Sequence, residues 1–329
     1  MADGEFAIRH HSSGINPFGI HHHSSAITHP PSAIAPKGLR HRTMHRVYSP
    51  EPVLKKPGLF FRDMWADIRA SRELAIALAK RDIKALYRQS VFGYLWAFLP
   101  PIVAALVFLF LRAGGSVEMA ETDIPYPAFV FVGTILWQIF VDALNGPLKV
   151  VGTSRAMIVK INFPREALIL AGVLITLFNF AVRLVILVPV VAFFYWKFPE
   201  QLGLSPSLLL FPVGIFAIIL LGYTFGLLLT PLGMLYKDIK NALTIVIGFW
   251  MFLTPVAFPL GTEGSFLSLV QHLNPVSPVV ETTRDWLYGT PPDMLPWFLG
   301  VVALSLVFVF IGWVLYRVAL PHVIARLGM

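Results

Sequence analysis

The sequence contains no cysteine and few charged residues. Without cysteine, disulfide bonds, zinc-thiolate sites and thiol nucleophiles are excluded. Only 13% of the 329 residues are charged and 56% are hydrophobic, whereas an average soluble domain has about 25% charged and about 45–50% apolar residues. A soluble fold could not bury so much apolar surface, so the composition predicts an integral membrane protein.

The chain also lacks a phosphate-binding loop for ATP. A Walker-type loop requires a Gly-Lys dipeptide, and none occurs in the sequence. Any ATP chemistry must therefore come from another subunit, and we expect no cofactor in this chain. We expect no metal site either, because the three consecutive histidines at 21–23 do not share one helical face.

The N-terminal segment, residues 1–57, differs in composition from the rest. It holds seven prolines and eight of the ten histidines, carries mostly basic charges and shows no apolar periodicity. Such a segment cannot bury enough surface to fold alone, so we predict a disordered, basic, His- and Pro-rich tail. Its first 30 residues lack the continuous apolar core of a secretory signal, so we expect no cleavage and a cytoplasmic tail.

Six long segments with few charges follow within a single predicted membrane domain, residues 58–329. A transmembrane helix needs about 20 mostly apolar residues. The predicted fold is therefore all-α, with six transmembrane helices at approximately 90–111, 124–148, 167–196, 207–235, 241–259 and 294–317.

Three further segments predict shorter helices. Between residues 58 and 88, apolar side chains recur at helical spacing among charges, which indicates an amphipathic interfacial helix before the first span. Residues 152–166 have room for one short cytoplasmic helix, which could lie on lipid or dock into a partner. Residues 260–292 contain too many polar groups to cross lipid, so we expect short re-entrant or gate helices on the outer side, the alternative being a passive outer cap.

Lysine and arginine are distributed unequally between the loops on the two sides of these spans. Of the 26 cations, 22 fall on the side of the N-terminus, and only Arg112, Lys197 and Arg284 fall on the other side. Such a bias marks the cytoplasmic side of a membrane. Both termini are therefore predicted to be cytoplasmic, and we assign the net charge of +8 to this asymmetry and not to nucleic-acid binding.

Two charged residues lie inside predicted spans. Asp142 lies about 27 Å along the second span from the outer side, and Arg183 lies about 24 Å along the third span from the inner side. In a hydrocarbon core about 30 Å thick, these depths place the two charges near opposite leaflets. We therefore expect no proton relay between them.

Four blocks of the chain resemble the membrane subunits of ABC exporters for O-antigen, capsule and teichoic-acid glycans. They are RDIKALYRQSVFGYLWAFLPP at 81–101, KINFPREAL at 160–168, LYKDIKNAL with WMFLTPVAFP within 235–259, and NPVSPVVETTRDWLYG at 274–289. The resemblance covers roughly residues 58–320. It implies a permease, not an enzyme: a homodimer in the bacterial inner membrane that exports a lipid-linked polysaccharide, driven by two copies of a P-loop ATPase.

The resemblance also implies roles for three groups of residues. The loop between the second and third spans would be the helix that couples to the ATPase, with the contact residues Arg155, Met157, Ile158, Lys160, Ile161 and Asn162. Arginines before the first span could receive the lipid pyrophosphate at the channel entrance, namely Arg62, Arg69, Arg72, Arg81 and Arg88. Aromatic side chains could line the glycan channel, the candidates being Tyr87, Phe92, Tyr94, Trp96, Trp137, Phe140, Trp250 and Phe252.

Two other functions remain open at this stage. An ABC exporter of small hydrophobic drugs or lipids would share the fold. An integral membrane glycan polymerase or ligase would need carboxylates or histidine at an outer active site, and Glu281, Asp285 and His272 lack a recognisable catalytic spacing.

Overall fold

The computed structural model describes residues 57–88, 124–161, 163–203, 205–236, 238–259 and 266–327, with a few isolated positions between 99 and 114. The predicted tail, apart from Pro57, and almost all of the predicted first span lie outside these described residues.

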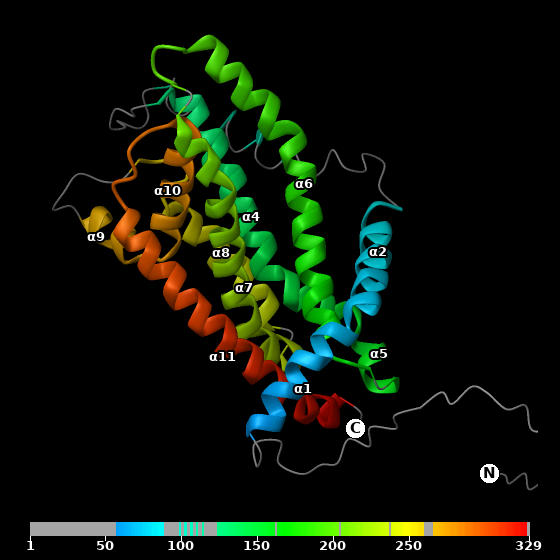
Figure 1. The fold of residues 1–329 in the computed structure, drawn as a ribbon. Coiled ribbons are helices and arrows are strands. Elements are labelled where there is room, and N and C mark those ends of the chain that lie inside the picture. Colours follow the sequence, from blue (N-terminus) through cyan, green and yellow to red (C-terminus); the bar gives the residue numbers. More distant parts are fainter. Residues whose placement is uncertain are drawn as a thin grey trace, which may run out of the picture. The chain divides into compact units, whose positions relative to one another are not determined.

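Every regular element in the described segments is helical (Figure 1). The elements are α1 (Pro57–Ala70), α2 (Arg72–Arg88), α4 (Tyr126–Thr153), α5 (Arg155–Lys160), α6 (Glu166–Lys197), the 3-10 helix η3 (Pro206–Leu210), α7 (Phe211–Leu235), α8 (Asp238–Phe252), α9 (Phe266–Leu273), α10 (Val276–Tyr288) and α11 (Leu295–Leu327). The predicted all-α class is confirmed.

Four of the described helices are long and apolar enough to cross a membrane, namely α4, α6, η3 with α7, and α11. They correspond to the predicted second, third, fourth and sixth spans. Helix α11 extends ten residues beyond the predicted end at 317, through Pro321. The structure thus supports a membrane-embedded bundle.

Helix α8 occupies the predicted fifth span but is shorter than predicted. It ends at Phe252, and residues 253–256 form turns instead of continuing to 259. Proline lacks an N–H and disfavours helical geometry in the residue before it, so Pro255 accounts for this early end. Fifteen residues extend only about 22 Å, which is less than the hydrocarbon core.

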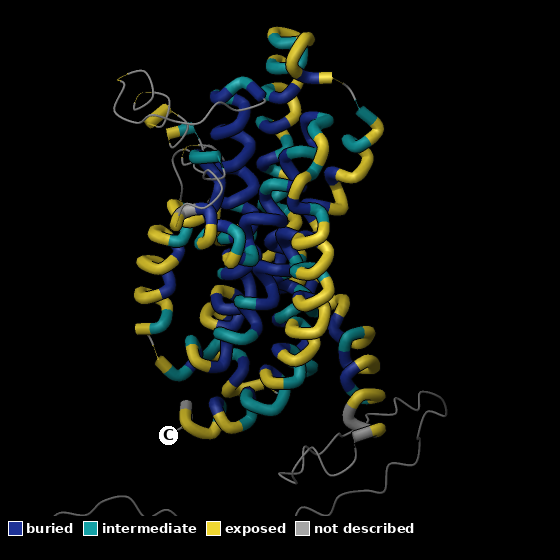
Figure 2. The backbone as a smooth tube through the Cα atoms, turned by 90° about the vertical axis from the view of Figure 1, so that its left-hand side faces the viewer, coloured by how far each residue is buried: buried dark blue, intermediate teal, exposed yellow. Residues whose placement is uncertain are grey.

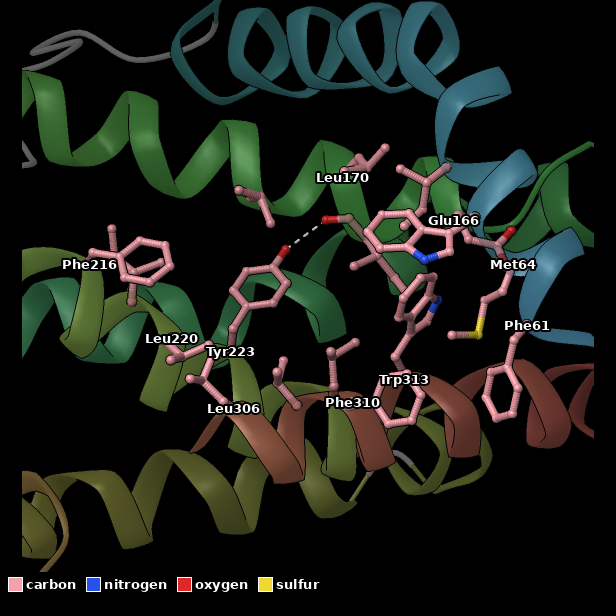
Figure 3. Close-up of a pocket in the computed structure, with 17 residues that line it drawn as sticks. Phe61, Met64, Glu166, Leu170, Phe216, Leu220, Tyr223, Leu306, Phe310 and Trp313 are labelled. Carbon is pink, nitrogen blue, oxygen red and sulfur yellow. Dashed lines mark hydrogen bonds between the residues drawn. The ribbon is translucent and has the colours of Figure 1, made fainter. Parts of the chain in front are cut away.

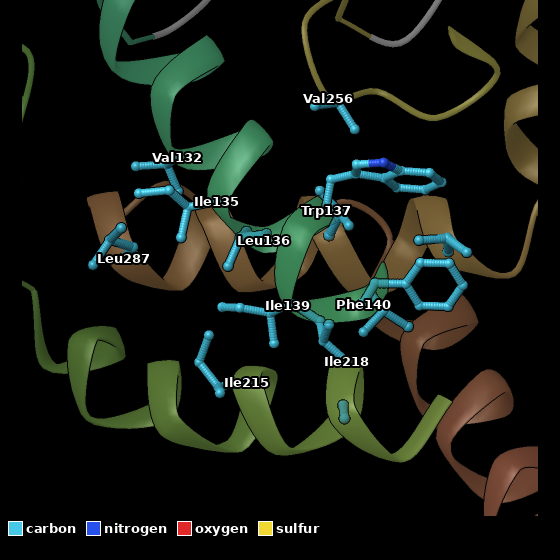
Figure 4. Close-up of a cluster of buried hydrophobic side chains, with 14 of the residues drawn as sticks. Val132, Ile135, Leu136, Trp137, Ile139, Phe140, Ile215, Ile218, Val256 and Leu287 are labelled. Carbon is cyan, nitrogen blue, oxygen red and sulfur yellow. The ribbon is translucent and has the colours of Figure 1, made fainter. Parts of the chain in front are cut away.

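Helix α4 forms the centre of the bundle, with most of its residues buried. It packs against α6 and α7, and α7 packs in turn against α11. Figure 2 shows buried backbone in the interior and exposed faces on the outer helices. Figure 4 shows the core between α4 and α7, where Ile139 and Phe140 face Ile215 and Ile218.

The close approach of α7 to α4 depends on two glycines spaced four residues apart. A Cβ atom on Gly222 would lie 2.7 Å from the carbonyl oxygen of Phe140, and one on Gly226 would lie 2.4 Å from that of Leu144. Any larger residue would push the helices apart. This small-xxx-small pattern is the usual means of tight helix packing in membranes, where burial from water supplies no driving force.

Candidate functional site

The short helix α5 forms the connection between the two antiparallel spans α4 and α6 (Figure 1). Its position and length agree with the short helix predicted for residues 152–166. Ile158 is buried in a small apolar cluster with residues of α4, α6 and α11. Arg155 donates a hydrogen bond from Nη2 to the carbonyl oxygen of Met234, near the C-terminal end of α7. The last carbonyls of a helix lack partners within it and attract cations, so this contact fixes α5 against α7.

The opposite side of α5 is open. Val159 and Ile161 are 42% and 57% exposed, and Lys160 is also exposed. Helical periodicity of the sequence places Met157, Ile158 and Ile161 on one apolar face, but the chain leaves the helix after Lys160 and Ile161 is extended. Helical periodicity therefore does not apply at Ile161. The exposed apolar side chains are Val159 and Ile161, and the sequence pattern did not single out Val159. Met157 is half-buried, and Asn162 lies outside the described residues.

Side chains of α2 contact the start of α5. Arg81 donates from Nη2 to the Oγ of Ser154 at 3.2 Å, and Thr153 donates from Oγ1 to Asp82 at 3.4 Å. Arg81 Nε also lies 2.7 Å from Asp82. Arg81, one of the predicted entrance cations, therefore hydrogen-bonds to Ser154 at the start of α5 and pairs with Asp82. The other four entrance candidates, Arg62, Arg69, Arg72 and Arg88, are exposed on α1 and α2.

The aromatic channel candidates fall into three groups. Phe92, Tyr94, Trp96 and the side chain of Tyr87 lie outside the described residues. Trp137 and Phe140 are buried in the core, where they pack with Phe225 and Trp250 at ring-centroid distances of 5.3 to 6.4 Å. Phe252 is 55% exposed. Of the described candidates, Phe252 is therefore the most accessible to a passing solute, and a channel role for any of them stays a prediction.

Asn274 connects α8 with α10. Its side chain accepts hydrogen bonds from Trp250 Nε1 at 2.9 Å and from the Val276 backbone N–H at 3.0 Å, and donates to Leu253 and Thr254. Four bonds use the whole capacity of one amide. The sequence pattern did not single out Asn274, although it opens the NPVSP block.

Arg284 of α10, one of the three cations on the predicted outer side, is buried. It is 1% exposed, its guanidinium lies 3.5 Å from the ring centroid of Phe129, and it donates to the carbonyl oxygen of Pro255 at 2.9 Å. It also pairs with Glu281. Together with Asn274, Arg284 therefore holds the turns after α8 against α4 and α10.

The three groups considered for an outer enzymatic site have structural partners. Glu281 pairs with Arg284, Asp285 accepts a hydrogen bond from Thr290 at 3.0 Å, and the His272 ring bonds to the Ser268 carbonyl at 2.7 Å. Among the described residues, no group of three His, Asp or Glu side chains could hold a metal ion. Each of these contacts is local, within α9 or within α10 and the residues that follow it, and none of them joins two of the three groups.

Asp285 nevertheless titrates in an unusual range. Burial, followed by the nearby Glu281 carboxylate, raises the pKa of Asp285 from 3.8 to about 7. Helix α10 is not one of the four described helices that are long and apolar enough to span a membrane, and the Asp285 side chain is only partly buried.

We expect Asp285 to make stability depend on pH. Because its folded-state pKa is raised, the folded protein retains a proton that the unfolded chain loses, so stability falls as pH rises between the two pKa values. The thermal midpoint of the wild type, measured relative to Asp285→Asn, should therefore be lower at about pH 8 than at about pH 5. Asp293→Asn, at an exposed position nearby, serves as the control. Parallel pH profiles for wild type and Asp285→Asn would contradict the assignment.

The two intramembrane charges form an ion pair, which corrects our expectation that they lie near opposite leaflets. Arg183 of α6 donates from Nη1 to the carboxylate of Asp142 on α4, and their side chains are 8% and 24% exposed. Side chains lean toward the N-terminus of their own helix, and α4 and α6 are antiparallel (Figure 1). Asp142 and Arg183 therefore lean toward each other. The two helices are also 28 and 32 residues long, about 42 and 48 Å, which exceeds the hydrocarbon core, so depths counted from one predicted end overestimated the separation of the two charges.

A family profile and three similar proteins agree with one another. The profile of the ABC-2 type transporter family matches residues 73–288. The O-antigen export system permease protein RfbA of Myxococcus xanthus is 30% identical over 249 residues, which cover 74% of this chain and 89% of that protein. The protein of the same name from Klebsiella pneumoniae is 25% identical over 217 residues, covering 65% and 79%. The polysialic acid transport protein KpsM of Escherichia coli is 27% identical over 255 residues, covering 73% and 91%. The family match extends from α2 through α10 and so includes α5.

Proposed function

The chain belongs to the ABC-2 type transporter family, and we propose that it is the permease subunit of an ATP-driven exporter of a lipid-linked polysaccharide. The observation that carries this proposal is the similarity to polysaccharide permeases over about three quarters of the chain. The chain is a transport subunit and not an enzyme. The carrier lipid, the bacterial inner membrane and the cytoplasmic position of both termini belong to the proposal.

The proposed ATPase contact is the open side of α5. Val159 and Ile161 present apolar surface beside Lys160, while Ile158 and Arg155 hold the helix to α4, α6, α7 and α11. A displacement of α5 by the ATPase would therefore be transmitted to α7 through the hydrogen bond of Arg155 and to α2 through that of Ser154. We propose that two ATPase subunits, one for each copy of this chain, bind here and supply ATP and Mg²⁺.

We propose that the chain works as a homodimer with α8 at or near the interface between the copies. Only Leu243 and Ile247 of α8 are buried, whereas Ile245, Val246, Phe249 and Phe252 are 53% to 71% exposed. Within the described segments, α8 packs mainly against α7. Helix α8 is also too short to cross the hydrocarbon core alone. We therefore propose that a second copy of the chain packs against its exposed apolar face.

The entrance and channel assignments follow from this arrangement. The exposed arginines Arg62, Arg69 and Arg72 lie on helices that precede the spans, where guanidinium groups could bind a lipid pyrophosphate. The exposed ring of Phe252 at the end of α8 is the proposed sliding contact for sugar rings. We propose that six spans per copy surround this pathway.

The decisive experiment is reconstitution of the chain with a P-loop ATPase from the same genome. We expect the two proteins to co-purify and lipid-linked polysaccharide to stimulate ATP hydrolysis. The double variant Val159→Asp with Ile161→Asp should weaken ATPase binding by roughly tenfold or more, because charged groups replace the apolar centre of the contact. Arg62→Ala with Arg69→Ala, and separately Phe252→Ala, should bind the ATPase normally and lose polysaccharide stimulation.

The matched control carries the same kind of change on α9. Leu269 and Leu273 are 58% and 73% exposed, so Leu269→Asp with Leu273→Asp also places two charges on exposed apolar positions, but it should leave ATPase binding intact. Equal binding by the α5 and α9 variants would reject α5 as the docking helix. Stimulation by hydrophobic drugs or free lipids, with none by polysaccharide, would favour the alternative exporter.

A further inference from the structure

A cavity of 620 Å³ lies between α1 and the spans α6, α7 and α11 (Figure 3). Its volume falls within the range of about 300–1,000 Å³ typical of ligand pockets. Nearly all of the 17 lining side chains are aliphatic or aromatic. The cavity is separate from α5, from α8 and from the aromatic rings around Trp137, although α1 also carries the proposed entrance arginines Arg62 and Arg69.

The length of the cavity matches one leaflet of a bilayer. Its lining on α7 extends from Phe216 to Leu227, and its lining on α11 extends from Leu306 to Trp313. At 1.5 Å per residue these stretches are about 16 Å and about 10 Å long. Half of a hydrocarbon core about 30 Å thick is about 15 Å. The cavity thus extends from the amphipathic helix α1 into the bilayer by about the depth that one acyl chain occupies.

Water is a poor occupant for this cavity. A buried water needs two to four polar partners, and only one donor here, Trp313 Nε1, is without a partner among the described residues. Tyr223 donates to the Ile169 carbonyl at 2.8 Å, and Glu166 pairs with Arg317. A hydrocarbon chain would instead gain dispersion contacts with every wall. It also has access, because Phe61 and Trp65 line the cavity while remaining 41% and 64% exposed.

One polar atom at the α1 end lacks a partner among the described residues. Trp313 Nε1 is buried without a hydrogen bond, and Trp313 lies in Figure 3 beside Phe61 and Met64 of α1. An indole N–H is only a donor, so it needs an acceptor. Near the membrane interface, where Trp commonly lies, the ester carbonyl of a phospholipid is such an acceptor.

We propose that this cavity binds one acyl chain of a bilayer phospholipid, whose ester carbonyl accepts a hydrogen bond from Trp313 Nε1. The lipid completes the packing between α1 and the spans, where Phe61 stacks on Phe310 at 5.7 Å and Trp65 meets Trp313 edge to face at 6.3 Å. The site holds a structural lipid, so its existence does not depend on what the protein transports.

The test uses vesicles that contain a phospholipid with a photoreactive group on its acyl chain. We expect saturable labelling of segments 216–227 and 306–313 in the full-length protein. Val309→Trp, which fills the cavity, should abolish this labelling, whereas Val307→Trp, two residues away on α11 and 56% exposed, should leave it unchanged. Trp313→Phe should lower lipid affinity about fivefold, the effect of one lost neutral hydrogen bond.

Several results would overturn the proposal. Undiminished labelling of a folded Val309→Trp protein would show that the cavity is not the site. If Val309→Trp fails to fold, competition in the wild type decides: labelling that excess unlabelled phospholipid does not reduce would be nonspecific and would count against it. If an isoprenoid phosphate reduces the labelling and phospholipid does not, the occupant of the cavity is the carrier lipid and not a phospholipid. None of these readouts measures transport, so they stand apart from the test of function.

Discussion

Replacing Arg317 with methionine should destabilise the protein by about 3–5 kcal/mol, which is the usual cost of removing one partner from a buried ion pair. Arg317 of α11 donates from Nη2 to Asp67 of α1 at 2.7 Å and from Nη1 to Glu166 of α6. The three side chains are only 15%, 8% and 5% exposed. Without the guanidinium, two carboxylates would remain buried side by side. Thermal unfolding of the purified protein in detergent measures the loss.

Matched variants separate the charge from the shape of Arg317. Arg317→Lys keeps the charge but cannot bridge both carboxylates with a planar fork, so we expect an intermediate loss. The triple variant Asp67→Asn, Glu166→Gln, Arg317→Met removes all three charges and should recover most of the stability. If Arg317→Met alone unfolds like the wild type, the cluster does not hold α1 to the spans.

The Arg317 cluster also bears on the proposed lipid cavity. Glu166 lines the cavity, and Asp67 lies on α1 between Met64 and Ala70. Loss of Arg317 should therefore loosen α1 and reduce lipid labelling, whereas filling the cavity with Val309→Trp leaves the ion pairs intact. The two substitutions affect the same region through different interactions.

The second large effect is expected at the pair of Asp142 and Arg183 within the spans. Asp142→Asn should cost about 3–5 kcal/mol, because it leaves the Arg183 guanidinium buried without a counter-ion. Arg183→Met should cost less, since the Asp142 side chain that remains is 24% exposed, compared with 8% for Arg183. The protein level in membranes and the thermal midpoint in detergent both report the difference.

The double variant Asp142→Asn with Arg183→Met provides the control for this pair. With both charges gone, no uncompensated charge remains in the spans, and stability should return to near the wild-type value. Losses that simply add in the double variant would show that the two residues act independently. Equal losses in both single variants would contradict the difference in burial.

Two departures from the sequence-based predictions have local causes. Helix α8 stops at Phe252 because Pro255 follows, although the apolar run continues to residue 259. Ile161 faces outward because the chain becomes extended after Lys160. Pro255 was visible in the sequence, but hydrophobicity and periodicity alone do not locate the last residue of a helix.

The burial of charged and aromatic side chains has a different cause. Trp137 and Phe140 are candidates for the channel lining, and the structure packs both rings in the core among other rings. Arg284, on the predicted outer side, is 1% exposed and lies over Phe129. Each of these outcomes depends on which helix lies next to which, and residue type does not specify that.

The amino-acid sequence by itself determined that this is an all-helical membrane protein, where its described spans lie and that a short helix joins α4 to α6, because length, hydrophobicity and charge are properties of a local segment. Only the tertiary structure decided that Asp142 meets Arg183, that Arg317 joins α1 to α6 and α11, and that a leaflet-long cavity remains between them. Such contacts join residues far apart in the chain, and they depend on helix direction, tilt and side-chain lean, which composition does not encode.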